Sequence, residues 1–191
     1  MTSNLVYYGK KLLLVCILSV AALTMTQCSK SGEESGNAGS GDPIGNIDDD
    51  EYVDLGLISM TMWKSTNELR GADAADNFYT YDEAVAAFGG RLPTKEQFDE
   101  LRRSCRWVWV SAGCYKVFGP NGNYIILPAD GFRDCMGGVF YRRTYGFYWS
   151  STPDGQTKAW YLNFYSDQVY MYNYNRCYAN SVRLVKNVQD Y

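Results

Sequence analysis

Tyrosine and asparagine side chains are concentrated in one short segment near the carboxyl end of the 191-residue chain. Between Trp160 and Val185 the segment contains six tyrosines and four asparagines. A phenol ring offers an apolar face and one hydroxyl, and an amide offers both a donor and an acceptor. Together these groups suit noncovalent contact with a ligand, as they do in antibody loops. The alternative is an unusual core, in which each buried hydroxyl needs a partner.

The candidate contact residues follow from this composition and from strand periodicity. Alternate residues of an extended strand point to the same side, so every second residue from Tyr170 to Tyr178 is expected on one face. That face would also carry Tyr172, Tyr174 and Arg176. The full set of predicted ligand-binding residues is Trp149, Trp160, Tyr161, Asn163, Tyr165, Tyr170, Tyr172, Asn173, Tyr174, Asn175, Arg176 and Tyr178.

Aromatic strands also occur in ordinary β-sheet cores, so both alternatives apply to parts of this set. We expect greater exposure at Tyr172 and Tyr174 than at Tyr161. The apolar neighbours Val169 and Met171 are the better core candidates. The two tryptophans of the set either extend the contact platform or belong to the core.

Composition excludes several classes of function. The chain contains no histidine, which rules out Ser–His–Asp catalysis, Cys–His catalysis and His-containing zinc sites. The formal net charge is −3 with no basic cluster, so nothing supports nucleic-acid binding. We therefore expect a protein that is not an enzyme and that has neither a cofactor nor a metal site.

The sequence does not decide whether the cysteines form disulfides, remain free or act as nucleophiles. Four of them lie in the second half of the chain: Cys105, Cys114, Cys135 and Cys177. They show no CxxC spacing, which argues against a metal site. An exported protein can keep disulfides, and the sequence does not decide the pairing. One or two disulfides and free buried thiols are about equally expected, and a catalytic thiol is the weakest alternative.

The amino-terminal residues have the pattern of an export signal. Lys10 and Lys11 precede an apolar run, residues 12–25, that is shorter than a membrane span needs. Cys28 stands where this run ends and a Gly/Ser-rich stretch begins, an arrangement that resembles a bacterial lipoprotein signal. We expect residues 1–28 to be a signal peptide ending at a lipidated Cys28. The alternative is an ordinary cleaved signal.

The predicted lipid anchor sets the predicted location. Acyl chains would hold an outer-membrane lipoprotein at the membrane, on the cell surface or on the periplasmic face. Without lipidation the protein would be secreted or periplasmic. Residues 29–50 contain almost no apolar side chains, so they are expected to be a flexible linker. Residues 51–186 are expected to form the one folded domain.

Two helices are predicted in that domain, each with a capping box. Thr80 is followed three residues later by Glu83, and Thr94 by Gln97. Short strands are predicted before and after the helices, and the strands 159–165 and 168–174 flank Ser166-Asp167 as a hairpin. The predicted strands are 51–58, 61–66, 106–110, 115–118, 124–128, 147–151, 159–165, 168–174 and 181–185. Residues 129–146 are expected to be a long ordered loop. The class is therefore α+β.

Several motifs in order resemble one family. "EYVDLGL", "RLPTKEQFDEL", "YKVFGPNGNYIILPADGFRD", "YGFYWSSTP" and "NSVRLV" look like the Fibrobacter succinogenes major paralogous domain, common in exported lipoproteins of Bacteroidetes. The resemblance implies a C-type-lectin-like fold in the branch of formylglycine-generating enzymes. In that fold two helices pack on antiparallel sheets, with long loops and a late hairpin that presents a ligand surface. The implied partner is a protein or a glycan.

The same branch offers further alternatives. It includes target proteins of diversity-generating retroelements, in which asparagine codons near the carboxyl end mutate to tyrosine, serine, aspartate and cysteine. The Tyr/Asn-rich segment contains these same residue types. Formylglycine-generating enzymes need a pair of cysteines late in the domain, and Leu184 stands where one is common, so that activity does not carry over. A structural or adhesive component of the cell surface is the remaining alternative.

Overall fold

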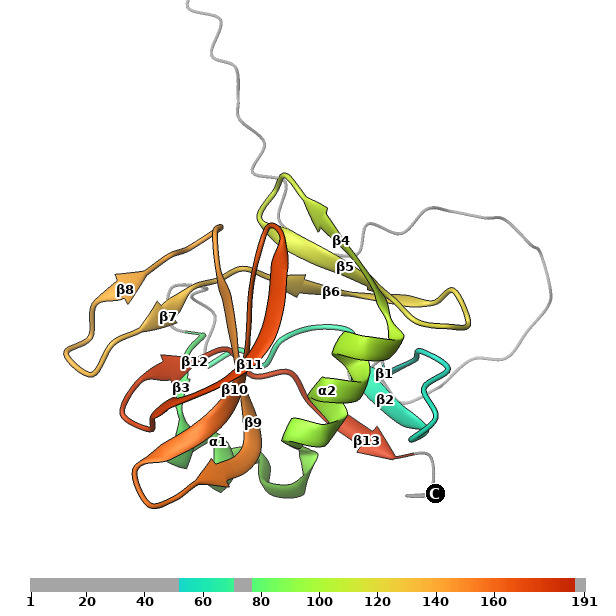
Figure 1. Ribbon diagram of the computed structural model, residues 1–191. Coiled ribbons are helices and arrows are strands. Elements are labelled where there is room, and N and C mark those ends of the chain that lie inside the picture. Colours follow the sequence, from blue (N-terminus) through green and yellow to red (C-terminus); the bar gives the residue numbers. More distant parts are fainter. Residues whose placement is uncertain (1–51, 71–76, 188–191) are drawn as a thin grey trace, which may run out of the picture.

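The computed structural model describes residues 52–70 and 77–187. The predicted signal, Cys28, the linker and the boundary at residue 51 lie outside the described residues. The described chain is a mixed α+β domain of antiparallel sheets and two short α-helices, as predicted (Figure 1). Its elements are β1 (Tyr52–Asp54), β2 (Thr61–Lys64), β3 (Tyr79–Thr80), α1 (Tyr81–Phe88), the 3-10 turn η2 (Gly89–Arg91), α2 (Lys95–Ser104), β4 (Arg106–Val110), β5 (Cys114–Phe118), β6 (Tyr124–Pro128), β7 (Phe132–Arg133), β8 (Val139–Phe140), β9 (Gly146–Asp154), β10 (Lys158–Tyr165), β11 (Gln168–Asn175), β12 (Ala179–Asn180) and β13 (Val185–Asn187).

Both helices begin at the predicted capping boxes. The Thr80 side chain accepts a hydrogen bond from the backbone N–H of Glu83, and Glu83 accepts one from the backbone N–H of Thr80. Thr94 and Gln97 exchange the same two bonds at the start of α2. These bonds satisfy N–H groups that have no partner within the helix. The local sequence therefore determines where each helix starts.

The strands form four sheets. One sheet has the order β1-β2-β13 and so joins the first and last described strands, while the sheet β11-β10-β9 contains the predicted hairpin. Tyr165 pairs with Gln168 at the hairpin end, as predicted. The other two sheets have the orders β4-β5-β6 and β3-β12-β7-β8. All the strand pairs within these sheets are antiparallel.

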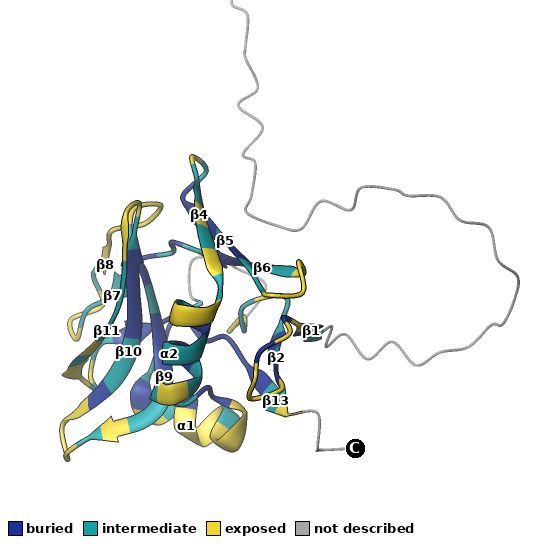
Figure 2. Cartoon of the chain, turned by 45° about the vertical axis from the view of Figure 1, so that its right-hand side comes forward, coloured by how far each residue is buried: buried dark blue, intermediate teal, exposed yellow. Residues whose placement is uncertain are grey.

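The core lies between α2 and the β9–β10–β11 sheet. Phe98 and Leu101 of α2 are fully buried, and they belong to one apolar cluster with Leu162 and Phe164 of β10. Figure 2 shows buried residues of this sheet in dark blue beside α2. Gly146 permits the closest approach in this layer, because a Cβ atom there would overlap the Phe164 ring.

Several predicted strand bounds differ from those in the structure. The first strand ends at Asp54 rather than continuing to residue 58, because the Asp54 carboxylate accepts the N–H of Gly56 and Gly56 has φ +70°. Residues 129–146 include the two-residue strands β7 and β8 rather than only loop. The predicted strand 147–151 is longer, spanning 146–154.

The predicted strand 181–185 is also different, since β13 begins only at Val185. The preceding residues use their backbone to join separate segments. Ser181 donates to the Phe147 carbonyl, and the Leu184 carbonyl accepts from Lys64. This stretch therefore ties β9 to β2 instead of continuing one ladder.

Arg183 lies in the middle of that stretch and is 1% exposed. Its guanidinium donates to the Asn67 side chain at 2.9 Å and to the carbonyls of Lys64 and Ile126 at 2.7 Å each. Burial lowers the pKa of Arg183 to about 10 from its ordinary 12.5, so the group stays charged at neutral pH. The buried cation therefore links β2 to β6 through bonds that satisfy its donors.

Candidate functional site

The register of the β9–β10–β11 sheet decides which tyrosines share a face. Tyr161 pairs with Trp149 on β9 and with Tyr172 on β11, and paired residues point to the same side. One step along, Asn163 pairs with Phe147 and Tyr170. We call this side the aromatic face, formed by Phe147, Trp149, Tyr161, Asn163, Tyr165, Tyr170, Tyr172 and Tyr174. It is the side of the sheet away from α2.

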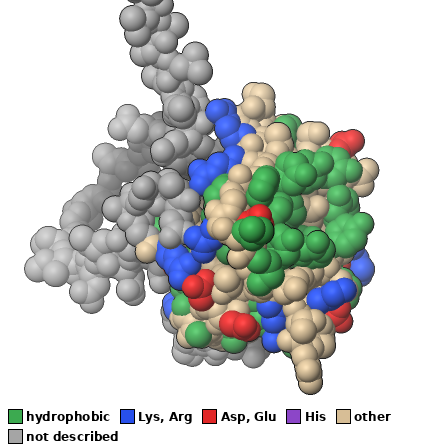
Figure 3. Space-filling view, turned by 90° about the vertical axis from the view of Figure 1, so that its left-hand side faces the viewer, with side chains coloured by type: hydrophobic (Ala, Val, Ile, Leu, Met, Phe, Trp, Pro, Cys, Tyr) green, Lys and Arg blue, Asp and Glu red, His purple; other side chains and the backbone are tan. Residues whose placement is uncertain are grey.

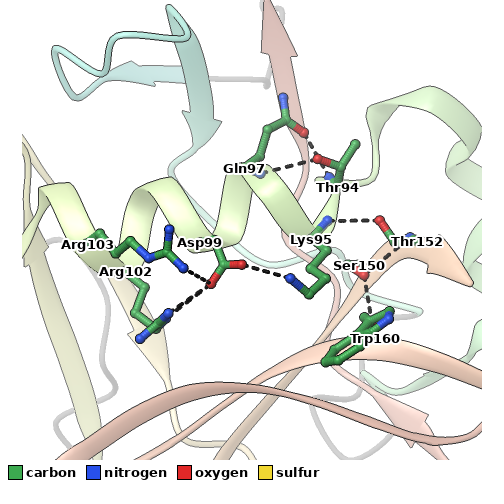
Figure 4. A network of polar contacts seen from close by, with 9 residues as sticks. All are labelled: Thr94, Lys95, Gln97, Asp99, Arg102, Arg103, Ser150, Thr152 and Trp160. Atoms are coloured by element: carbon green, nitrogen blue, oxygen red, sulfur yellow. Dashed lines mark hydrogen bonds and ion pairs between the residues drawn. The ribbon is translucent and has the colours of Figure 1, made fainter. Parts of the chain in front are cut away.

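Two predicted contact residues lie on the opposite side. Trp160 and Asn173 pair with each other one residue out of phase with Tyr161, so they point toward the α2 side. The Lys95 ammonium of α2 lies 5.0 Å from the centre of the Trp160 ring. Figure 4 shows Trp160 beside the start of α2, where Lys95 also bonds Asp99. The prediction that Trp160 and Asn173 join the tyrosine surface is therefore wrong, because strand alternation separates them from it.

The aromatic face is hollowed at one end by a pocket of about 220 Å³. The lining residues come from four parts of the chain and are aromatic, with one amide. They are Phe132, Tyr141, Phe147, Trp149, Tyr161, Tyr174, Tyr178 and Asn180, and we call this set the aromatic pocket. Figure 3 views the molecule from the side of β7 and β8, where hydrophobic side chains gather into one broad patch.

One wall of the pocket comes from the Gly-rich segment 129–146. Phe132 of β7 lies 5.0 Å from the Phe147 ring and 5.4 Å from the Tyr178 ring. Tyr141 follows β8 with φ +59°, a conformation rare for an aromatic residue and associated with functional sites. The backbone N–H of Tyr145 and the hydroxyl of Thr144 donate to the Tyr141 carbonyl and hold this turn.

A disulfide ties this wall to the other. Cys135, in the turn between β7 and β8, is bonded to Cys177, with the two Cα atoms 5.1 Å apart. Cys177 immediately precedes the pocket residue Tyr178. The bond therefore restrains the approach of the β7–β8 hairpin to the segment after β11. Of the pairings left open by the sequence, the structure contains this one.

Some neighbouring rings of the pocket meet at steep angles. The Trp149 and Tyr161 rings are inclined by 83° at 5.8 Å, and the Tyr174 and Tyr178 rings by 67° at 4.7 Å. Such edge-to-face contacts are a favoured geometry for aromatic pairs. Other pairs are less steep, such as Phe147 with Tyr161 at 34°.

The lining of the pocket is uncharged at neutral pH. Burial, followed by the neighbouring phenols Tyr174 and Tyr172, raises the pKa of Tyr161 to about 12. A hydrogen bond with Tyr174, then burial, raises the pKa of Tyr178. These hydroxyls therefore remain protonated, and they offer donors and acceptors without a formal charge.

Two of the predicted residues are buried and form hydrogen bonds with backbone carbonyls beneath the aromatic face. Trp149 is fully buried and forms part of the pocket lining, with its indole N–H donating to the Tyr79 carbonyl at 2.8 Å. Asn163 is 5% exposed and donates to the Gly146 carbonyl at 3.0 Å. The side chain of Asn163 therefore joins β10 to the start of β9, where it is not available to a ligand.

Arg176 does not continue the tyrosine alternation, because β11 ends at Asn175. Its guanidinium donates to the carbonyls of Lys158 and Gly155 and lies 4.6 Å from the centre of the Tyr81 ring. The Asn175 side chain accepts the N–H of Cys177 and turns the chain. The expectation that Arg176 shares the tyrosine face is wrong, since it fastens the β10–β11 hairpin to α1 instead.

The predicted order of exposure among the tyrosines is confirmed. Tyr172 is 54% exposed and Tyr174 is 50% exposed. Tyr161 is less exposed than either and packs against Trp149. Val169 and Met171 pack against the core cluster. Tyr165 and Tyr170 extend the aromatic face away from the pocket, with ring centres 6.0 Å apart.

Sequence reasoning missed half of the pocket. Phe132 and Tyr141 lie in the supposed loop, and Phe147 lies in a predicted strand. Asn180 belongs to the Tyr/Asn-rich segment but was not in the predicted set. For the first three residues, aromatic character was the available signal. Met136 and Phe140, exposed by 95% and 46%, enlarge the apolar surface beside them. Large exposed apolar patches commonly mark interaction sites.

The acidic and cysteine side chains bear on metal binding and on thiol chemistry. Among residues 52–70 and 77–187, no group of three or more Cys, Asp or Glu residues could hold a metal ion. Burial, with a contribution from Glu100, raises the pKa of the free Cys105 thiol to about 11. A thiol that stays protonated is a poor nucleophile.

Fold and site together define a mixed α+β domain with an open aromatic pocket. A family model described as "Domain of unknown function (DUF8237)" matches residues 119–185, which include the whole aromatic pocket. No curated protein and no solved structure matches the chain. Within the part of the chain that the structure describes, no helix is long and apolar enough to span a membrane.

Proposed function

We propose that this protein is a non-catalytic ligand-binding protein whose contact surface is the aromatic pocket and the adjoining aromatic face. The observation that carries the proposal is the pocket itself. Rings from four separated segments line it without carrying a charge. Two tyrosines are half-exposed there: Tyr174 lines the pocket, and Tyr172 lies on the adjoining aromatic face. A domain that needed these rings only for its core would cover them.

The expected ligand is a protein or a glycan. Tyrosine supplies large contact area with little loss of side-chain entropy, which makes it effective at binding surfaces. Aromatic residues also dominate the energy of protein interfaces. The disulfide between Cys135 and Cys177 supports this use, since a pre-formed site pays less ordering entropy when the ligand binds.

The test compares two variants of the purified protein on a glycan array and on intact cells. Tyr172→Ala with Tyr174→Ala removes two exposed rings and is expected to weaken binding at least about tenfold. Tyr124→Ala is the matched control, because Tyr124 is a partly exposed tyrosine on β6, outside the pocket. Both variants should melt close to the parent protein. Equal binding by the double variant and the parent would reject this surface.

We also propose the C-type-lectin-like fold and kinship with the Fibrobacter major paralogous domain. The joining of the first and last described strands in β1-β2-β13, the two helices and the late β10–β11 hairpin support it. An experimental structure compared with C-type lectins checks this proposal. A different connection of the strands around β9–β11 would refute it.

Export and lipidation are proposed on the sequence alone. Radiolabelled palmitate should be incorporated by cells that make the protein and not by cells that make Cys28→Ser. Protease added to intact cells distinguishes the surface from the periplasmic face. Retroelement diversification would require a reverse transcriptase gene and a near-copy of the last coding segment nearby.

A further inference from the structure

We propose that the aromatic pocket binds a small organic cation, an alkylammonium group such as the trimethylammonium end of choline or of trimethylated lysine. The inference rests on the proposed function, because it names a chemical class of ligand for the same site. It depends on the ring arrangement, on the charges around the pocket and on one buried amide.

The rings form a partial box. Phe132 and Phe147 are inclined by 68°, Trp149 and Tyr161 by 83°, and Tyr174 and Tyr178 by 67°. The face of an aromatic ring is the negative part of its quadrupole. A cation held within about 6 Å of several such faces is attracted by each of them, and most strongly where water is excluded.

The protein's own cations leave these rings unoccupied. Elsewhere the chain places basic side chains over aromatic faces, with Lys95 over Trp160, Arg176 over Tyr81 and Arg142 over Phe78. Within the described residues, no Lys or Arg lies over a ring of the aromatic pocket. The pocket therefore lacks an internal cation where the rest of the domain supplies one.

An acidic side chain acts on one phenol of the pocket. The Asp134 carboxylate lies close enough to act electrostatically on the Tyr178 phenol, and it accepts the N–H groups of Met136 and Gly138. These bonds hold the carboxylate at the β7–β8 turn. A cation in the pocket would experience this field favourably, and an anion would not.

The polar side chains of the pocket lining are four phenols and one amide. A buried hexose would need partners for several hydroxyls, each of which costs free energy if left unpaired. Apart from phenols, the lining offers the Asn180 amide. Asn180 is 3% exposed and lines the pocket. Its amide offers both a donor and an acceptor, which suits a ligand with one polar group beside its cationic end.

The experiment titrates the full-length protein with a matched pair of compounds by calorimetry. Choline carries the trimethylammonium group, and neohexanol replaces that group by an uncharged tert-butyl group of the same shape. Choline is expected to bind at least about tenfold more tightly. Equal or tighter binding of neohexanol, or no binding of any cation, would overturn the proposal. Trimethylated lysine and phosphatidylcholine vesicles, titrated in parallel, distinguish the carriers of the group.

Two variants at one position supply the control. Tyr174→Phe keeps the ring face and should retain choline affinity within about threefold, whereas Tyr174→Leu keeps apolar bulk without the face and should lose about tenfold. Because Tyr174 is half-exposed, both should fold. Full affinity in Tyr174→Leu would contradict the cation site.

The proposed function can survive failure of this inference. If methyl glucoside or neohexanol binds, and the Tyr172/Tyr174 double alanine variant abolishes that binding, the pocket is a ligand site of another class. If every titrated compound fails and the array and cell assays also show no effect of the double variant, both proposals fail.

Discussion

The two faces of the β9–β10–β11 sheet are built from adjacent residues and have opposite properties. Leu162 and Phe164 point toward α2 and are fully buried, while Tyr161 and Tyr165, one residue earlier and later, point toward the aromatic face and are half-exposed. The face toward α2 pairs Leu162 with Tyr148 and Met171 in one closed cluster. The other face opens into the aromatic pocket.

This difference separates two uses of aromatic residues. On the α2 side an aromatic ring such as Phe164 lies in a closed cluster of aliphatic and aromatic side chains and contributes to folding through buried area. On the pocket side the rings contact chiefly each other, so they form a stiff surface that remains partly open. Changes on the first face should therefore reduce stability, and changes on the second should reduce binding.

The largest expected effect is on the α2 face. Leu162→Ala removes a fully buried side chain from the core cluster and should lower the free energy of unfolding by about 2–5 kcal/mol. Denaturant unfolding measures the loss. Tyr172→Ala on the opposite face of the neighbouring strand should change it by less than about 1 kcal/mol. Similar losses in the two variants would mean that the faces do not differ.

The second effect concerns the link between the pocket walls. Cys135→Ser with Cys177→Ser removes a bond across a sequence separation of 42 and should cost about 2–4 kcal/mol of stability. Ligand affinity should fall as well, because the β7–β8 wall is no longer held. Cys105→Ser, which alters a cysteine outside this link, is the control and should leave ligand affinity unchanged. Unaltered affinity in the double variant would show that the pocket does not need the disulfide.

Much of this architecture follows from local sequence. The capping pairs Thr80–Glu83 and Thr94–Gln97 fixed both helix starts, and Ser166-Asp167 marked the hairpin turn correctly. These signals act over a few residues, so no knowledge of the remote chain is needed. The exposure of Tyr172 and the packing of Met171 followed from strand alternation in the same way.

The other half of the pocket depends on contacts between distant segments. Phe132 reaches Tyr178 because β12 pairs with β7 and because Cys135 is bonded to Cys177. The local sequence of the Gly-rich stretch 129–146 contains no pattern that predicts such pairing. Trp160 was misplaced for a simpler reason: composition marked it as a contact residue, while its strand phase directs it to α2.

A smaller loss of stability is expected at Asn163, which lies on the aromatic face yet is buried. Asn163→Ala removes the donor to the Gly146 carbonyl and should cost about 1–3 kcal/mol. Asn163→Asp keeps the shape but loses the donor, so it should not restore stability. Thermal unfolding of both variants measures the effect. If either variant keeps full stability while losing ligand affinity, Asn163 contacts the ligand directly after all.

The smallest effect is an alkaline titration that distinguishes the phenols of the two faces. Burial and the nearby Tyr174 and Tyr172 raise the pKa of Tyr161 from 10.0 to about 12. Burial raises the pKa of Tyr148, on the α2 face, further still. The folded state therefore favours the neutral phenol, and its contribution to stability is complete below pH 10 and is lost as pH rises through about 12.

Ultraviolet absorbance of phenolate should accordingly show a step near pH 12 to which two phenols of the half-open face contribute, because burial raises the pKa of Tyr170 to about 12 as well. Tyr161→Phe should therefore reduce this step, and Tyr161→Phe with Tyr170→Phe should remove it. Tyr148 should contribute no step until the domain unfolds, since its hydroxyl also donates to the Pro128 carbonyl at 2.7 Å inside the core. Tyr148→Phe therefore leaves the step near pH 12 intact. Two outcomes would contradict this prediction: loss of that step in Tyr148→Phe, or ionisation of Tyr161 near the ordinary phenol pKa of 10.0. Either would mean that the two rings have equivalent surroundings and that the closed and open faces do not differ.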